Sequence, residues 1–115
     1  MDDNEMGVDE TTSRPVQMLK VTKPQHPMLV EAIETRQRLA CMYHRKARII
    51  EPQCYGLGRK GQELLRVHQI EGGDQKEPLF SPSDIEDLQV IGTFTRPGPR
   101  YKRGDSAMVT IFAQL

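Results

Sequence analysis

The sequence predicts a mainly β domain with terminal helices, of the α+β class, in which about five short strands form a small barrel or a strongly curved sheet. Two observations predict this fold class. Apolar and polar residues alternate in several short segments in the middle of the chain, and apolar residues recur at helical spacing near both ends. The 115 residues suffice for one domain. A chain of this size buries roughly 60–70% of its unfolded surface, so its core needs no disulfide or metal.

The first 26 residues differ in composition from the rest of the chain. They are polar and show no sustained apolar period, which predicts a mostly disordered acidic and polar tail at residues 1–26 and a folded domain at residues 27–115. Within the tail, residues 16–21 have the composition of a short docking strand. Residues 1–14 hold five acids and one base, whereas residues 15–115 hold 15 bases and 11 acids. This contrast favours a solvated tail over an intramolecular mask of a basic face.

The folded domain is expected to open with a helix at Pro27. Leu29, Ala32 and Ile33 recur at helical spacing, and proline suits the first helical turn because its missing N–H has no helical partner there. The period then changes to two. Alternation and apolar content predict strands at residues 39–44, 47–54, 62–70, 79–80 and 89–94. Pro52 interrupts the second of these, which favours an edge or a bulge.

Two more helical segments are expected after residue 80. Ser83 stands three residues before Glu86, the pattern of a capping box, and predicts one helical turn at residues 83–88. A loop rich in proline, glycine and basic residues follows at residues 96–104, and we call it the late loop. Asp105 is then expected to cap a helix at residues 105–115. The apolar face of that helix would consist of Met108, Ile111, Phe112 and Leu115.

The two cysteines, Cys41 and Cys54, fit a reducing compartment. A hairpin that turns near Lys46 would place Cys41 opposite about Glu51 and leave Cys54 beyond the partner strand, so no disulfide is expected. No apolar stretch reaches the roughly 18 residues of a membrane span. The N-terminus lacks the basic and then apolar pattern of a leader. These features predict a cytoplasmic location without a membrane partner.

Two short motifs in the chain match known signatures by coincidence. Residues 56–61 spell G-x-G-x-x-G, but the dinucleotide fingerprint requires a helix directly after it within a βαβ unit, and here a strand-like segment follows. The three glycines are better explained by a hairpin connection that requires positive φ. Arg103-Gly104-Asp105 matches the integrin-binding tripeptide by chance, with Gly104 leading into the expected C-terminal helix.

The chain shows no pattern for a metal site or for catalysis. Residues three apart on a strand face opposite sides of the sheet, so Cys41 and His44 do not converge with Cys54 or His68 on one ion. No serine has a supporting base and acid, and the paired carboxylates lie only in the solvated run at residues 84–87. We therefore expect a non-enzymatic protein with no catalytic residue, no metal ligand and no cofactor.

Basic residues that gather at connections are the strongest indication of function. Bases that flank an aromatic residue in loops suit phosphate binding and base stacking, which predicts an anionic ligand, either nucleic acid or a nucleotide. The opposing interpretation is a solvated loop surface, and the sequence weighs the two about equally. The expected binding residues all lie in turns, in the late loop or on the third strand: Arg45, Lys46, Arg59, Lys60, Arg66, Arg100, Tyr101, Lys102 and Arg103.

From residue 29 to residue 115 the order of features resembles the WYL domain family. The resemblance rests on four segments: Ile50-Glu51-Pro52-Gln53-Cys54-Tyr55-Gly56-Leu57, residues 61–67, Leu79-Phe80 and residues 97–105. WYL domains are bacterial ligand-sensing modules, often in transcription regulators, with a small SH3-like or Sm-like barrel. The resemblance implies that fold here, with an N-terminal and a C-terminal helix, and a stand-alone regulatory function.

The chain departs from the WYL pattern at two places. Glu63-Leu64-Leu65 stands where the family has Trp-Tyr-Leu, and Ser81 stands where the family has its ligand-binding arginine. The second departure favours an alternative function, a protein–protein interaction module that uses the terminal helices or a barrel edge to bind a protein partner or a second copy. The basic connections favour the ligand-binding interpretation.

Overall fold

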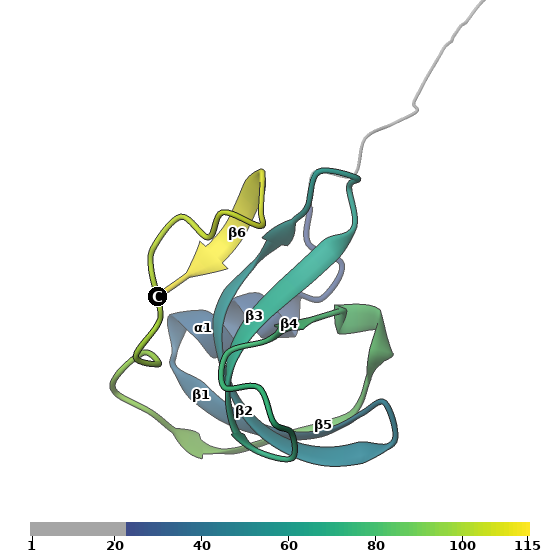
Figure 1. Cartoon of the computed structure of the whole chain (residues 1–115), viewed down its shortest axis with the longest axis vertical. Coiled ribbons are helices and arrows are strands. Elements are labelled where there is room, and N and C mark those ends of the chain that lie inside the picture. Colours follow the sequence, from purple (N-terminus) through teal and green to yellow (C-terminus); the bar gives the residue numbers. More distant parts are fainter. Residues whose placement is uncertain (1–22) are drawn as a thin grey trace, which may run out of the picture.

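A computed structural model describes residues 23–115 of the chain. One helix accompanies a single sheet of six antiparallel strands, so the protein is mainly β within the α+β class, as predicted (Figure 1). A short 3-10 turn, η2, lies between the fourth and fifth strands. In chain order the elements are α1 (Pro27–Glu34), β1 (Gln37–Tyr43), β2 (Lys46–Leu57), β3 (Glu63–Glu71), β4 (Leu79–Phe80), η2 (Pro82–Asp84), β5 (Ile85–Thr93) and β6 (Thr110–Gln114).

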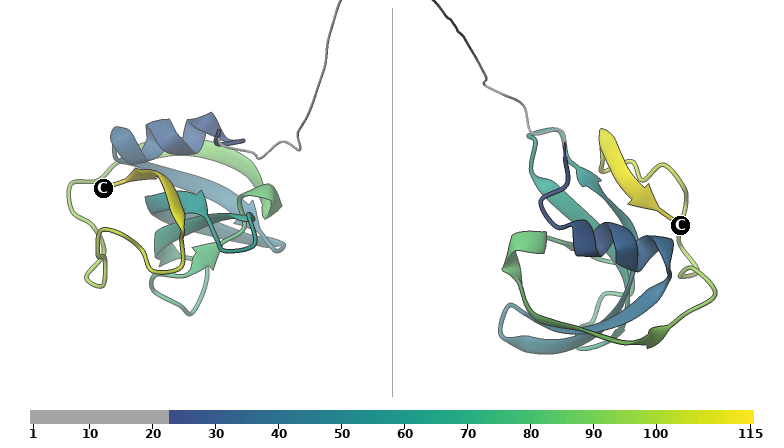
Figure 2. Two further views of the ribbon diagram at one scale, coloured as in Figure 1. Left: turned by 90° about the horizontal axis from the view of Figure 1, so that it is seen from above. Right: turned by 180° about the vertical axis from the view of Figure 1, so that it is seen from behind.

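The long strand β2 organises the sheet. The strand order is β4-β3-β2-β1-β5, and β6 also pairs with β2. One edge of β2 pairs first with β1, where Leu39 lies opposite Ile50, and then with β6, where Leu57 lies opposite Thr110. Within residues 23–115 no pairing joins β4 to β5, so the sheet curves strongly but stays open (Figures 1 and 2).

The core lies inside this curve, and α1 covers it (Figure 2). The positions predicted from helical spacing are buried, since Leu29, Ala32 and Ile33 are each at most 1% exposed. A fully buried leucine or isoleucine side chain contributes roughly 1.5–3 kcal/mol relative to exposure. Buried residues of β1, β2 and β3 belong to the same core cluster as α1, among them Leu39, Ile50, Tyr55, Leu65 and Val67.

The first hairpin turns earlier than predicted. His44 and Arg45 have φ values of 50° and 67°, and β1 and β2 end on the pair Tyr43 and Lys46. Two consecutive positive φ angles form the tight two-residue turn that matches the twist of paired strands. Cys41 therefore lies opposite Arg48, and the predicted register with Glu51 is wrong. Cys41 and Cys54 are both buried thiols without a disulfide.

The predicted helical turn at residues 83–88 is wrong in extent. The 3-10 turn covers only Pro82–Asp84, and Ser81 rather than Ser83 is at the cap position, without a side-chain cap bond. The chain then enters β5 four residues earlier than predicted, because the outer edge of β1 offers backbone partners from Tyr43 onward. Asp87, with φ of 54°, marks a bulge where the register of this pairing shifts.

The predicted C-terminal helix is also wrong, because residues 110–114 form strand β6. A helix of about eleven residues is marginal in water by itself. Against β2, the same residues gain backbone pairs between Cys54 and Gln114 and between Tyr55 and Ala113. Phe112 packs edge-on against the ring of Tyr55, at a centroid distance of 5.3 Å. Pairing and packing with a distant strand therefore outweigh the helical spacing of the apolar residues.

Three smaller predictions concern glycine, proline and the N-terminal tail. The connection of β2 to β3 is a hairpin, but only Gly61 among its three glycines has positive φ, at 79°. The register of β2 with β3 shifts just after Pro52, so of the predicted edge or bulge the structure has a bulge. The backbone N–H groups of Gln25 and His26 already donate to Glu63 and Tyr55. The tail before residue 23, including the docking strand expected at residues 16–21, lies outside the described residues.

Candidate functional site

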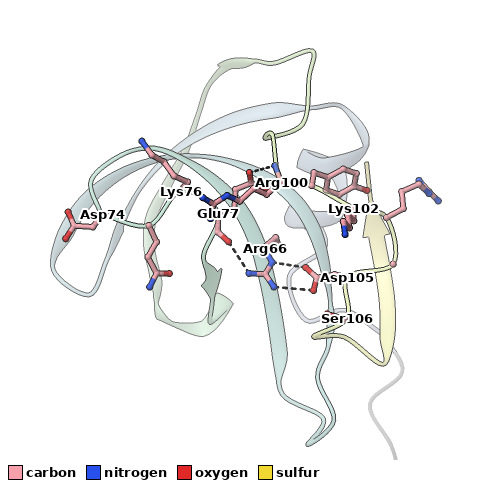
Figure 3. Close-up of a pocket in the computed structure, with 12 residues that line it drawn as sticks. Arg66, Asp74, Lys76, Glu77, Arg100, Lys102, Asp105 and Ser106 are labelled. Atoms are coloured by element: carbon pink, nitrogen blue, oxygen red, sulfur yellow. Dashed lines mark hydrogen bonds and ion pairs between the residues drawn. The ribbon is translucent and has the colours of Figure 1, made fainter.

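The described part of the protein has an open groove of about 720 Å³ on its surface (Figure 3). We call it the basic groove. Strand β3, the loop between β3 and β4, and the late loop before β6 line it. Its lining residues are Arg66, Asp74, Gln75, Lys76, Glu77, Arg100, Tyr101, Lys102, Arg103, Gly104, Asp105 and Ser106.

Arg66 lies in the middle of the basic groove, and internal partners hold its guanidinium (Figure 3). Its Nε donates to Asp105 Oδ2 over 2.8 Å, and its two terminal nitrogens donate to Asp105 Oδ1 and to the carbonyl oxygen of Glu77. The hydrogen bond from Arg66 holds the pKa of the Asp105 carboxyl below its ordinary value, helped by the N–H of Ala107. Arg66, predicted as a ligand contact, is therefore first a structural anchor of the late loop.

The Glu77 carboxylate fixes the other end of the same loop. Its Oε2 accepts the backbone N–H of Arg100 over 2.7 Å, and its Oε1 accepts from the side-chain amide of Gln53. Gln53, fully buried in β2, also accepts the N–H of Gly98 at its Oε1 over 2.6 Å. A buried polar side chain with both ends satisfied stabilises one arrangement of its neighbours. The backbone of the late loop is therefore held in place by β2 and by the loop between β3 and β4.

Tyr101 and Arg103 both reach the end of the described chain. The Tyr101 hydroxyl and an Arg103 terminal nitrogen each donate to the carbonyl oxygen of Leu115, both over 2.6 Å. Burial raises the pKa of the Tyr101 phenol, so the hydroxyl stays a donor at neutral pH. The half-buried ring of Tyr101 is thereby held at the wall of the groove.

Three cations of the groove have no internal partner among the described residues. Among residues 23–115, the side chains of Lys76, Arg100 and Lys102 make no hydrogen bond or ion pair, and all three residues are exposed. Two of the three acids in the groove, Glu77 and Asp105, are engaged in the internal contacts described above. The unpaired charge of the lining is therefore mainly positive. The sequence reasoning missed Lys76, which is an isolated base in a turn and carries no pattern.

The structure brings five of the nine predicted binding residues into this groove: Arg66, Arg100, Tyr101, Lys102 and Arg103. Lys46 instead lines a second, smaller hollow of about 410 Å³ beside the aromatic rings of Tyr43 and Phe80. Arg45 lies in the adjacent β1–β2 turn, and Arg59 and Lys60 lie in the β2–β3 turn, all exposed and outside both hollows. The predicted set is thus divided among three places on the surface.

Other bases of the sequence stabilise the fold. Arg36 donates to the carbonyl oxygen of Thr95, and Arg38 donates to the buried carboxylate of Glu51 over 2.7 Å.

Burial raises the pKa of the Cys54 thiol to about 11, so this thiol is protonated and unreactive at neutral pH. Within residues 23–115 no group of three His, Cys, Asp or Glu side chains is placed to hold a metal ion.

Comparisons with protein-family models, with curated proteins and with solved structures find no match. No helix among residues 23–115 has the length and apolar character required to cross a bilayer.

Proposed function

We propose that the protein is a non-enzymatic binding module that takes a phosphate-bearing ligand, a nucleotide or single-stranded nucleic acid, in the basic groove. The observation that carries this proposal is the convergence of Lys76, Arg100 and Lys102, without internal partners among the described residues, on one open hollow. A volume of about 720 Å³ lies within the range of small-molecule sites, roughly 300–1,000 Å³.

The neighbouring contacts support this proposal because they prepare the groove for an anion. Asp105 is neutralised by Arg66, so its carboxylate opposes a phosphate only weakly. Glu77 and Gln53 hold the backbone at Arg100 and Gly98, so ligand binding need not order this part of the loop. The held ring of Tyr101 offers a surface on which a base can stack, a contact that contributes about 1–3 kcal/mol on single strands.

The resemblance to WYL domains adds a regulatory context to this proposal. We infer that the open, strongly curved sheet corresponds to the small SH3-like or Sm-like barrel of that family. The position of β2, which carries β1 and β6 on one edge and β3 on the other, supports this inference. On this view the protein is a stand-alone sensor of cytoplasmic nucleotides or nucleic acid.

The experiment is fluorescence anisotropy with a labelled thymidine decanucleotide and a labelled adenine nucleotide, at about 50 and about 200 mM salt. The double variant Arg100→Glu with Lys102→Glu should weaken binding strongly. It should also reduce the slope of log affinity against log salt by about 1.4, since each phosphate contact on a single strand contributes about 0.7. The double variant Arg59→Glu with Lys60→Glu is the matched control, because it makes the same charge change in an exposed turn outside the groove.

An equal loss in both double variants would show that the ligand responds to overall charge or contacts the β2–β3 turn. It would contradict the basic groove as the site. If the folded wild type bound neither probe at the lower salt concentration, the proposal itself would be wrong.

One observation favours the alternative function, a protein-interaction module. The outer edge of β5 ends the sheet, and Val90 and Ile91 on it are 52% and 48% exposed. Of the two surfaces predicted for this function, the pair of terminal helices is lost, because β6 replaces the C-terminal helix. Bulges along β5 weaken its edge as a template for pairing. Sedimentation of the purified protein would show whether a second copy binds.

A further inference from the structure

The smaller hollow contains a stack of three rings. The rings of Tyr43 and Phe80 are parallel within 1°, at a centroid distance of 3.8 Å, and the imidazole of His44 stacks on Tyr43 at 4.0 Å and 18°. Two rings this close to Tyr43 must occupy its opposite faces, so His44 ends the stack. We call this hollow the aromatic hollow. It is lined by Tyr43, His44, Lys46, Arg48, Gln69 and Phe80, together with parts of the loop between β3 and β4.

The outer ring of the stack is oriented and exposed. His44 Nε2 lies 3.0 Å from Asp84 Oδ2, and the side chain of His44 is still 60% exposed. The Tyr43 hydroxyl accepts the backbone N–H of Ser81 over 2.8 Å, which holds the middle ring. One face of the imidazole therefore packs on Tyr43, while the other faces solvent. An aromatic face held in this way suits a stacked base, because stacking then requires little further ordering.

Two cations lie beside the stack. Lys46 is exposed, and it is the first residue after the turn, where it pairs with Tyr43. The Arg48 guanidinium lies 5.5 Å from the centroid of Tyr43 and 5.7 Å from that of Phe80. Its terminal nitrogens donate to Gln69 Oε1 and to the carbonyl oxygen of Tyr43, so internal bonds hold the Arg48 charge in place.

The aromatic hollow and the basic groove share a wall. Asp74 and Gln75, in the loop between β3 and β4, line both. Gln69 Nε2 donates to the carbonyl oxygen of Gln75, and Gln69 N donates to that of Lys76. Gly72, with φ of 108°, lies so close to Ala47 that an added Cβ would be 2.2 Å from its carbonyl oxygen. These contacts hold the loop against β2 and β3, so the two hollows keep a fixed position on either side of it.

We propose that the aromatic hollow is a second subsite for the ligand of the basic groove. A base stacks on the exposed face of His44, and Lys46 contacts the adjacent phosphate. This inference rests on the proposed function. It selects single-stranded nucleic acid over a mononucleotide, because only an oligonucleotide extends across the shared loop and occupies both sides of it.

The test compares a labelled thymidine dinucleotide with a labelled thymidine decanucleotide by fluorescence anisotropy. The variant His44→Asn removes the ring but retains a residue that tolerates positive φ, so the hairpin turn is preserved. Lys46→Glu removes the adjacent charge, and Lys60→Glu is its matched control in the other exposed turn. Wild type should bind the decanucleotide more tightly than the dinucleotide. His44→Asn should weaken decanucleotide binding by at least about fivefold, the lower end of a stacking contact.

Lys46→Glu should reduce the salt slope of decanucleotide binding by about 0.7, whereas Lys60→Glu should leave it unchanged. If His44→Asn and Lys46→Glu bind the decanucleotide as wild type does, the second subsite is wrong. Loss of binding in Arg100→Glu with Lys102→Glu would then still support the basic groove. If wild type binds neither oligonucleotide, both the proposed function and the second subsite are wrong.

Discussion

The variant Asp105→Asn tests whether the pair of Arg66 and Asp105 builds the basic groove. The Asp105 carboxylate accepts two hydrogen bonds from Arg66, over 2.8 and 3.3 Å, and one from the N–H of Ala107 over 3.0 Å. The Asp105 side chain is 9% exposed and that of Arg66 28% exposed, so water replaces these bonds only in part. The amide retains one acceptor oxygen but loses the charge.

A hydrogen bond to a charged group contributes about 1.5–3 kcal/mol, and the remaining exposure of Arg66 reduces this value, so we expect a loss of about 2 kcal/mol in the free energy of unfolding. For a domain of this size, a loss of about 2 kcal/mol lowers the melting temperature by roughly 8–16 °C. Urea unfolding followed by circular dichroism measures the first quantity. Asp74→Asn is the matched control, since Asp74 is an exposed acid in the same groove, and its loss should change stability by less than about 0.5 kcal/mol.

The loss of stability caused by Asp105→Asn should become smaller as the pH falls into the acid range. Because the pKa of Asp105 is lowered on folding, its contribution to stability is fully present above the unfolded pKa of about 3.9. It is lost as the pH falls through the folded pKa. The difference between wild type and variant should therefore be constant near neutral pH and shrink in acid. Equal stability of wild type and Asp105→Asn at pH 7, or an equal loss in Asp74→Asn, would refute the anchoring role.

Two further predictions concern the elements that hold the sheet together. Gly56→Ala should destabilise the protein by roughly 1–3 kcal/mol in urea unfolding, because the added Cβ would lie 2.0 Å from the carbonyl oxygen of Thr110 in β6. Gly92→Ala, where the added Cβ meets nothing nearer than 4.0 Å, should not destabilise it, and the reverse order would contradict the close packing of β2 against β6. Tyr55→Phe should cost about 1–3 kcal/mol, because the hydroxyl donates to Glu63 over 2.6 Å in a buried position. Burial acts to raise the pKa of Glu63, but hydrogen bonds from Tyr55, Gln25 and His26 outweigh it, so carboxyl titration by NMR should show a higher Glu63 pKa in the variant.

The main β elements were predictable because their signals are local. Leu39, Cys41 and Tyr43 occupy alternate positions, and all three are buried in β1. The helix at Pro27 followed from a proline and three apolar residues within one short segment. The bulge at Pro52 followed from the N–H that proline lacks.

The candidate site was predictable only in composition. The basic loop at residues 100–103 was visible in the sequence, and it does line the basic groove. The pairing of Arg66 with Asp105 spans 39 residues and has no sequence signal. Lys76 and His44 were missed as site residues for the same reason, since their importance depends on which loops lie beside them.

The sequence by itself determined the mainly β class, the positions of most strands and the surplus of bases in the connections. These properties depend on the period of apolar residues and on turn chemistry, which act over a few residues. The tertiary structure alone decided that residues 110–114 form a strand and that β2 carries two partners on one edge. Met108, Ile111, Phe112 and Leu115 fit a helical period, but backbone pairing with a strand more than fifty residues earlier is a non-local interaction that no local period encodes.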